Sequence, residues 1–189
     1  MVYHIHVRLN TEPAVKRTVC LDSETDMDRV HHVIQAAMGW KNRHHYRFTQ
    51  GNSVVSLPDK MSRPGERHAA RTKLSDCLKS EGDALWYEYD FGDEWMHEIV
   101  LAKIVDDGEQ EFPLCLNGNG ACPPEEIGGV RGYQSVVKVL GNPKHPDYLA
   151  MKAYAGDSFD PDSFDVDAAN EKLRELDVFI SQAEKEKDF

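Results

Sequence analysis

The stretch Tyr87-Glu-Tyr-Asp-Phe-Gly-Asp-Glu-Trp-Met-His-Glu-Ile-Val-Leu101 decides how the centre of this chain folds. Apolar and polar residues alternate on both sides of Asp90-Phe-Gly-Asp93, which is typical of two half-buried strands joined by a tight turn. Glycine adopts positive φ at no steric cost, so we expect Gly92 to do so and to bring the two aspartates together. Trp95 and His97 then share one face of the second strand. The stretch therefore predicts a hairpin with carboxylates, an indole and an imidazole near its turn.

The sequence around this hairpin predicts an α+β fold, because strand patterns come first and helical patterns come last without regular alternation. We expect a mixed or antiparallel N-terminal sheet with one packed helix, followed by C-terminal helices, in a single domain over residues 1–189. Residues 51–71 show no periodicity and are predicted to form a mobile loop, and the tail 184–189 is predicted to fray. The strand patterns cover 2–9, 15–21, 44–49, 85–91 and 95–105, and the helical patterns cover 25–38, 133–140, 146–155 and 165–180.

Composition limits the classes of protein and partner. The net charge of −11 is uneven, since residues 1–80 carry +5 and residues 81–189 carry −16. The acidic part repels phosphate backbones, so a nucleic-acid partner is not expected for the whole chain, although a basic N-terminal face remains open. The four cysteines are too sparse for a disulfide scaffold, and no signal peptide or membrane span is evident. We expect a cytoplasmic protein without a membrane partner.

A second segment with polar chemistry is Cys115-Leu-Asn-Gly-Asn-Gly-Ala-Cys122-Pro-Pro-Glu-Glu-Ile-Gly-Gly129, which we interpret as a Gly/Pro-rich loop. If it folds over the hairpin, the two thiolates and His97 form three zinc ligands, and a carboxylate supplies the fourth. A reduced structural pair of thiols and a redox-active pair are the alternatives. Glu125 and Glu126 bind a cation or amine, or begin the following helix.

His97 also has two readings. Asp90 or Asp93 holds its imidazole in one tautomer and raises its pKa, as an acid/base or ligand histidine requires, or the pair merely ties the hairpin together. The pocket predicted from both segments contains nine residues: Asp90, Asp93, Trp95, His97, Cys115, Cys122, Glu125, Glu126 and Tyr133.

In this order along the chain, Tyr89-Asp-Phe-Gly-Asp-x-Trp-x-His97, Cys115-x-x-Gly-x-Gly-Ala-Cys-Pro-Pro-Glu125, Gly128-Gly129 and Gly132-Tyr133 resemble the Ri-plasmid open-reading-frame-three-like family. The resemblance extends to Gly39-Trp40 and His44, to Asn142-Pro-x-His-Pro146 and to Phe159-Asp-Pro-x-x-Phe-Asp165. It implies a single α+β domain whose relatives include proteins of unknown activity and proteins carried on mobile elements. One departure is Val15-Lys-Arg-Thr18, where the family often has Trp-Arg-Arg. The positions that the resemblance marks are Asp90, Gly92, Asp93, Trp95, His97, Cys115, Cys122, Pro123, Pro124, Glu125, Gly128, Gly129 and Tyr133.

These observations lead to three functional hypotheses. The first is a small binding or adaptor domain whose acidic Asp/His/Cys pocket takes a cationic peptide, a small ligand or a metal. The second is a metal-assisted hydrolase, in which His97, Cys115 and Cys122 hold zinc while Asp93 or Glu125 acts as base on a bound water. The third is a nucleic-acid accessory protein that uses the basic N-terminal part.

Overall fold

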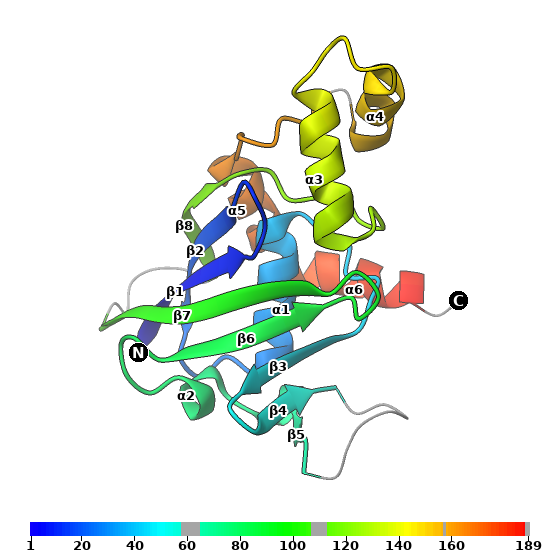
Figure 1. The fold of residues 1–189 in the computed structure, drawn as a ribbon. Helices are drawn as coiled ribbons and strands as arrows, with labels where there is room; N and C mark the ends of the chain where they lie inside the picture. The colour runs from blue at the N-terminus through cyan, green and yellow to red at the C-terminus, as the bar shows by residue number, and fades with distance from the viewer. Residues whose placement is uncertain (58–64, 107–112, 157, 188–189) are drawn as a thin grey trace.

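One eight-stranded sheet organises the computed structural model, which describes residues 1–57, 65–106, 113–156 and 158–187 (Figure 1). The strand order is β5-β4-β3-β6-β7-β1-β2-β8. Neighbouring strands are antiparallel except for the parallel pair β4 and β5, so the sheet is mixed. The strands are β1 (Val2–Leu9), β2 (Val15–Asp22), β3 (Tyr46–Gln50), β4 (Ser53–Ser56), β5 (Arg67–His68), β6 (Ala84–Tyr89), β7 (Trp95–Val105) and β8 (Leu114–Asn119).

The helices divide into a group packed on the sheet and a projecting pair. Helix α1 lies behind the strands in Figure 1, α5 packs against α1 and β8, and α6 packs against α1. Helices α3 and α4 pack against each other and project beyond the sheet. The bounds are α1 (Met27–Met38), η1 (Ala69–Arg71), α2 (Leu74–Cys77), α3 (Gly129–Leu140), α4 (Tyr148–Ala155), α5 (Val166–Arg174) and α6 (Leu176–Lys187).

The two faces of the sheet differ because the central strands alternate in polarity. Odd-numbered positions of β1, of β6 and of β7 as far as Leu101 point toward α1 and are buried, and the even-numbered positions between them lie on the opposite face. The inner face carries the largest fully buried side chains, including Trp95, Tyr87, Tyr89 and Phe48. Apolar burial on this face is the main contribution to stability.

Helix α1 begins and ends at residues with clear local causes. Asp26 is the N-cap, and its side chain accepts a hydrogen bond from the backbone N–H of Arg29. The predicted helical pattern starts at Thr25, one residue before this N-cap. Gly39 ends the helix at φ 98° with its N–H bonded to Gln35 O, as its position in the sequence predicts.

The α+β prediction is confirmed, and several elements differ from the predicted ones. Residues 51–71 include β4, β5 and η1, while 58–64 lie outside the described residues. Strands this short give no readable periodicity. Cys115 lies in strand β8 rather than in a loop, because the edge of β2 supplies backbone partners. The last helical pattern is divided at Glu175 into α5 and α6, and α6 continues to Lys187 through most of the predicted frayed tail.

None of the helices in the described ranges is both long enough and hydrophobic enough to cross a bilayer.

Candidate functional site

The turn between β6 and β7 is built by Asp90 rather than by Gly92. Asp90 has φ 58° and Glu94 has φ 53°, whereas Gly92 is not at positive φ. The Oδ1 atom of Asp90 accepts the backbone N–H groups of Gly92 at 2.9 Å and Asp93 at 3.3 Å. Its Oδ2 atom lies 3.4 Å from Nε2 of His44. The expected role of Gly92 was therefore wrong, and Asp90 is occupied by its own turn.

His97 is a core residue on the inner face of β7. Its Nδ1 atom lies 3.0 Å from Trp95 O and 3.3 Å from Tyr87 O, so backbone carbonyls orient the ring and no aspartate does. The ring is fully buried and packs edge-on against Trp40. Burial lowers the pKa of His97 to about 3, opposite to the raised value predicted for an acid/base histidine. Its Nε2 atom has no hydrogen-bond partner among the described residues.

The proposed zinc ligands do not come together. Strands β7 and β8 are three positions apart in the sheet, which separates His97 from Cys115 by roughly 14 Å across the strands alone. The Sγ atom of Cys115 instead donates to Asn117 O at 3.4 Å. Among the described residues, no group of three or more His, Cys, Asp or Glu side chains is arranged to hold a metal ion. The described residues therefore do not assemble the ligand set that the zinc hypothesis requires.

Both cysteines of this segment favour the neutral thiol. Burial is the largest cause that raises the pKa of Cys115, and burial likewise raises the pKa of Cys122. Reactive cysteines need the opposite shift, toward the thiolate. These thiols therefore match the structural alternative better than the redox alternative.

Residues 122–129 dock on the β6–β7 turn through close backbone contacts. The backbone N–H of Gly128 donates to Oδ2 of Asp93 at 3.2 Å. A Cβ atom at Gly129 would lie 2.5 Å from Asp93 O, so only glycine permits this approach. The two segments singled out by the sequence therefore meet at one joint.

Glu125 ties the same joint to the connection between α1 and β3. Its Oε1 atom accepts the hydroxyl of Tyr89 at 2.9 Å, and its Oε2 atom accepts the backbone N–H of Lys41 at 3.1 Å. Beside it, Trp40 donates its indole N–H to Pro123 O at 2.9 Å. Both oxygens of Glu125 are thus used inside the protein, and the joint is closed rather than hollow.

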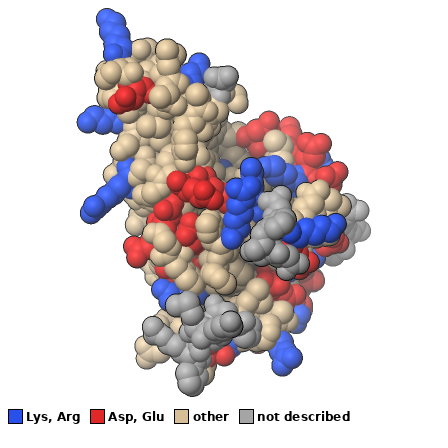
Figure 2. Space-filling model, turned by 90° about the vertical axis from the view of Figure 1, so that its right-hand side faces the viewer, with Lys and Arg blue, Asp and Glu red and all other residues tan. Residues whose placement is uncertain are grey.

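An open cavity of about 420 Å³ lies next to this joint. Its walls come from the α1–β3 connection, from residues 122–126 and from the end of α4. Glu126 is exposed, and its backbone O accepts the hydroxyl of Tyr154 at 3.2 Å. Lys41 and Arg43 also line the cavity and supply positive charge. Figure 2, which views this side of the molecule, shows acidic and basic side chains next to each other below a mostly uncharged projecting part.

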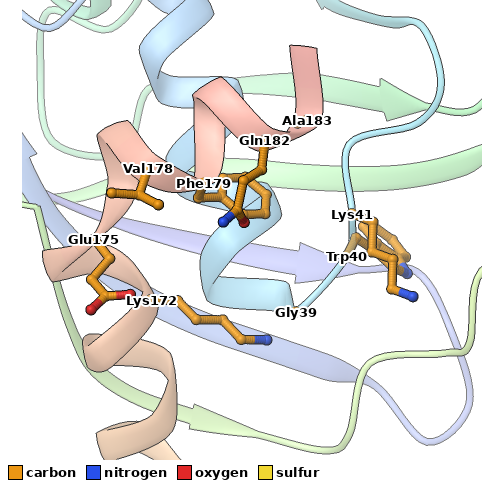
Figure 3. A pocket seen from close by; sticks show the side chains of 9 residues that line it. All are labelled: Gly39, Trp40, Lys41, Lys172, Glu175, Val178, Phe179, Gln182 and Ala183. Atoms are coloured by element: carbon orange, nitrogen blue, oxygen red, sulfur yellow. The ribbon is translucent and has the colours of Figure 1, made fainter. Parts of the chain in front are cut away.

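A second hollow of about 350 Å³ adjoins the first, because Gly39, Trp40 and Lys41 line both. Figure 3 shows Val178 and Phe179 of α6 on one side of it and Trp40 with Lys41 on the other. Val178 is 53% exposed, so this end of the hollow offers an open apolar side chain, beside the charged side chains of Lys172 and Glu175. We call the two joined hollows the Trp40 groove.

The predicted pocket residues are thus divided among four places. Trp95, His97 and Tyr133 are buried, and burial raises the pKa of Tyr133 to about 12. Asp90, Asp93 and Glu125 form the joint, and Cys115 lies apart in β8. Only three of the predicted residues line the Trp40 groove: Cys122, Glu125 and Glu126.

Sequence reasoning also missed groove residues that carry charge or a ring, among them Trp40, Lys41, Arg43 and Tyr154. Trp40 entered only through the resemblance. The sequence signal for Trp40 is its position directly after Gly39, the glycine that ends helix α1. The end of the helix fixes where the connection begins, and so fixes the position of this side chain. Tyr154 gave no signal, because its position depends on how α4 packs against the body of the protein.

Comparison with known proteins agrees with this fold. The sequence model of the plasmid pRiA4b ORF-3-like protein family matches residues 1–168. An uncharacterized protein y4hQ of Sinorhizobium fredii is 35% identical over 162 residues, which cover 85% of this chain and 81% of that protein. The crystal structure of a protein of unknown function, MM3350 from Methanosarcina mazei Go1, is similar with a TM-score of 0.80 and 29% identity. That similarity covers 88% of this chain and 96% of the other.

Proposed function

We propose that this chain, which belongs to the plasmid pRiA4b ORF-3-like protein family, is a binding or adaptor domain. Its ligand is a short peptide segment held in the Trp40 groove. The observation that carries the proposal is that two neighbouring hollows share Gly39, Trp40 and Lys41 in their linings. Each hollow lies within the range of roughly 300–1,000 Å³ that is typical of ligand pockets. Together they offer an extended path rather than a single closed cavity.

The chemistry of the groove favours a peptide with one apolar and one basic side chain. Val178 and Phe179 provide an open apolar surface for the first, and burial of an aliphatic side chain there contributes roughly 1.5–3 kcal/mol. The exposed carboxylate of Glu126 attracts the second at the other end. Lys41 lies between them, where an ammonium group suits the carbonyl oxygens of a bound main chain.

The test is a screen of immobilised peptides that pair a basic with an apolar residue, followed by fluorescence anisotropy of the best peptide. Val178→Glu places a charge in the apolar hollow, and Glu126→Lys reverses the charge at the polar end. Each is expected to weaken binding by about tenfold or more. The matched controls are Leu116→Glu, on an exposed apolar side chain of β8, and Glu12→Lys, on an exposed carboxylate outside the groove. If no peptide binds above background, or if groove and control variants bind equally, the proposal is wrong.

The metal-assisted hydrolase of the sequence hypotheses gains no support from the arrangement of its residues. His97 is closed off in the core, Cys115 lies in β8, and Glu125 is already bonded through both oxygens. We therefore do not propose it.

A further inference from the structure

The sheet face opposite α1 carries a row of polar side chains that crosses six strands. Cross-strand pairing places Trp86 of β6 beside Glu98 of β7, Glu98 beside Arg8 of β1, and Arg8 beside Lys16 of β2. Thr49 and Asn119 extend the row at its two ends. Paired residues of an antiparallel sheet project from the same face, so these side chains form one surface.

A neighbouring row fixes the orientation of the polar groups beside Arg8. The hydroxyl of Thr18 donates to Oδ1 of Asn117 at 2.9 Å, so its oxygen accepts the ring N–H at Nδ1 of His6 at 3.1 Å. This leaves the NH₂ group of Asn117 as a donor and leaves Nε2 of His6 for another partner. The two groups that the chain orients in this way are both exposed.

These side chains surround a cavity of about 470 Å³ on the open face. His6, Arg8, Lys16 and Asn117 line it, and Glu98 is its acidic member. Neither Arg8 nor Lys16 has an acidic partner within 4.0 Å in the part of the chain that the structure describes. The cavity is therefore a local cationic site on a protein whose net charge is −11.

We propose that this cavity binds a phosphate-bearing ligand of nucleotide size, with its phosphates on Arg8 and Lys16. Guanidinium and ammonium groups with a converging amide donor form strong charge-assisted hydrogen bonds to phosphate oxygens. The carboxylate of Glu98 accepts a sugar hydroxyl, a role that acidic side chains play in nucleotide sites.

An aromatic ring on the same row suits the base of such a ligand. Trp86 is 45% exposed and lies two strand spacings from Arg8, or about 10 Å. A base stacked on an exposed aromatic ring contributes roughly 1–3 kcal/mol. A nucleoside diphosphate extends over a comparable span. Its base therefore reaches Trp86 while its terminal phosphate reaches Arg8.

The phosphate has two chemical sources, a free nucleotide and a single-stranded nucleic acid. The acidic remainder of the chain repels a long polyanion and has less effect on a small ligand held inside the cavity. We therefore infer the free nucleotide. This site lies on a different face from the Trp40 groove, and its failure leaves the peptide proposal unaffected.

The test is isothermal titration calorimetry of the full chain with ADP, adenosine, inorganic phosphate and oligothymidylate as separate probes. ADP is expected to bind saturably, and adenosine and phosphate alone more weakly. Arg8→Ala/Lys16→Ala is expected to weaken ADP binding by about tenfold or more, and Trp86→Ala to weaken ADP binding while sparing phosphate. The matched control is Arg71→Ala/Lys79→Ala, which removes the same charge from exposed positions away from the sheet face.

Thermal unfolding of each variant, followed by circular dichroism, establishes that it is folded before its titration is read. Oligothymidylate binding that depends on Arg8 and Lys16 supports the phosphate site and identifies a strand as its source. No saturable binding of any phosphate-bearing probe would overturn the proposal, and so would equal binding by the Arg8/Lys16 variant and its control.

Discussion

The two faces of the sheet use their polar residues in opposite ways. On the inner face, polar groups are buried and most of them are bonded to one another, apart from atoms such as Nε2 of His97. The hydroxyl of Tyr87, for example, lies 2.7 Å from Nδ1 of His31 and accepts a hydrogen bond from Nε2 of Gln35 at 3.0 Å. On the open face, Arg8 and Lys16 are exposed and lack acidic partners among the described residues. Buried polar groups need partners to offset their desolvation, and exposed ones do not.

This difference shows that a segment rich in polar and charged residues need not expose them to a ligand. The hairpin of residues 87–101 is rich in residue types that act in catalysis or ligand binding in other proteins. Most of these side chains face the core or take part in the joint. The groups that remain free for a ligand lie in the Trp40 groove and on the open face of the sheet. The inner side chains build the scaffold that positions these two surfaces.

Two tryptophans provide the largest test of this difference. Trp40 is 3% exposed and donates to Pro123 O, so Trp40→Ala is expected to lower the free energy of unfolding by about 3–5 kcal/mol. Trp86 is 45% exposed on the open face, and Trp86→Ala is expected to change it by about 0.5 kcal/mol or less. Urea denaturation followed by circular dichroism measures both. Comparable losses at the two sites would mean that the open face is covered in solution.

Acid sensitivity of the inner face is the next effect. Burial lowers the pKa of His97 to about 3, below the value of about 6.5 expected in the unfolded chain. The unfolded chain therefore takes up the proton first, and the stability present above about pH 6.5 is lost as the pH falls toward 3. Between about pH 7 and about pH 5 the loss from this group is about 2 kcal/mol.

The measurement compares urea midpoints at these two pH values for the wild type and His97→Asn, with His6→Gln as a matched replacement of an open-face histidine. His97→Asn is expected to be less stable at neutral pH and to lose less stability on acidification. An equal pH dependence in wild type and His97→Asn would show that this imidazole is not the group responsible.

The fold was predictable where one face of an element is buried. The alternation in residues 2–9 and 95–105 located β1 and β7 to the residue, because a strand with one buried face repeats every two positions. The short strands β4, β5 and β8 escaped, since their pairing depends on a neighbouring strand edge rather than on their own composition. The break at Glu175 also escaped, because the apolar stripe continues across it.

The candidate site was predictable as a meeting of two segments and not as a cavity. The predicted pocket brought the two segments together, and Gly128 and Gly129 do lie against Asp93. Which carboxylates remain free could not be read from the sequence. Glu125 and Glu126 are adjacent and identical in chemistry, and only the register of the joint decides that Tyr89 and Lys41 occupy the first.

These two glutamates give a third and smaller test. Glu125→Ala leaves the hydroxyl of Tyr89 and the backbone N–H of Lys41 without their acceptor, and we expect a loss of about 1–2 kcal/mol. Glu126→Ala removes an exposed carboxylate and is expected to have an effect within about 0.5 kcal/mol. Chemical denaturation of the two variants under the same conditions measures the change in the free energy of unfolding for each. A larger loss at Glu126 would mean that the joint is assembled in a different register.

The smallest effect is expected from an ion pair on the open face. Nε of Arg47 lies 2.6 Å from Oε2 of Glu88, but the Arg47 side chain is 43% exposed, so solvent screens the attraction. Arg47→Ala is expected to cost about 0.2–1 kcal/mol at low salt and less at about 1 M salt, where the screening length falls to about 3 Å. The double variant with Glu88→Ala completes a cycle that isolates the pair from the packing of each stem. A coupling that persists unchanged at high salt would mean that this part of the open face is shielded from water, contrary to the accessible surface inferred for the phosphate site.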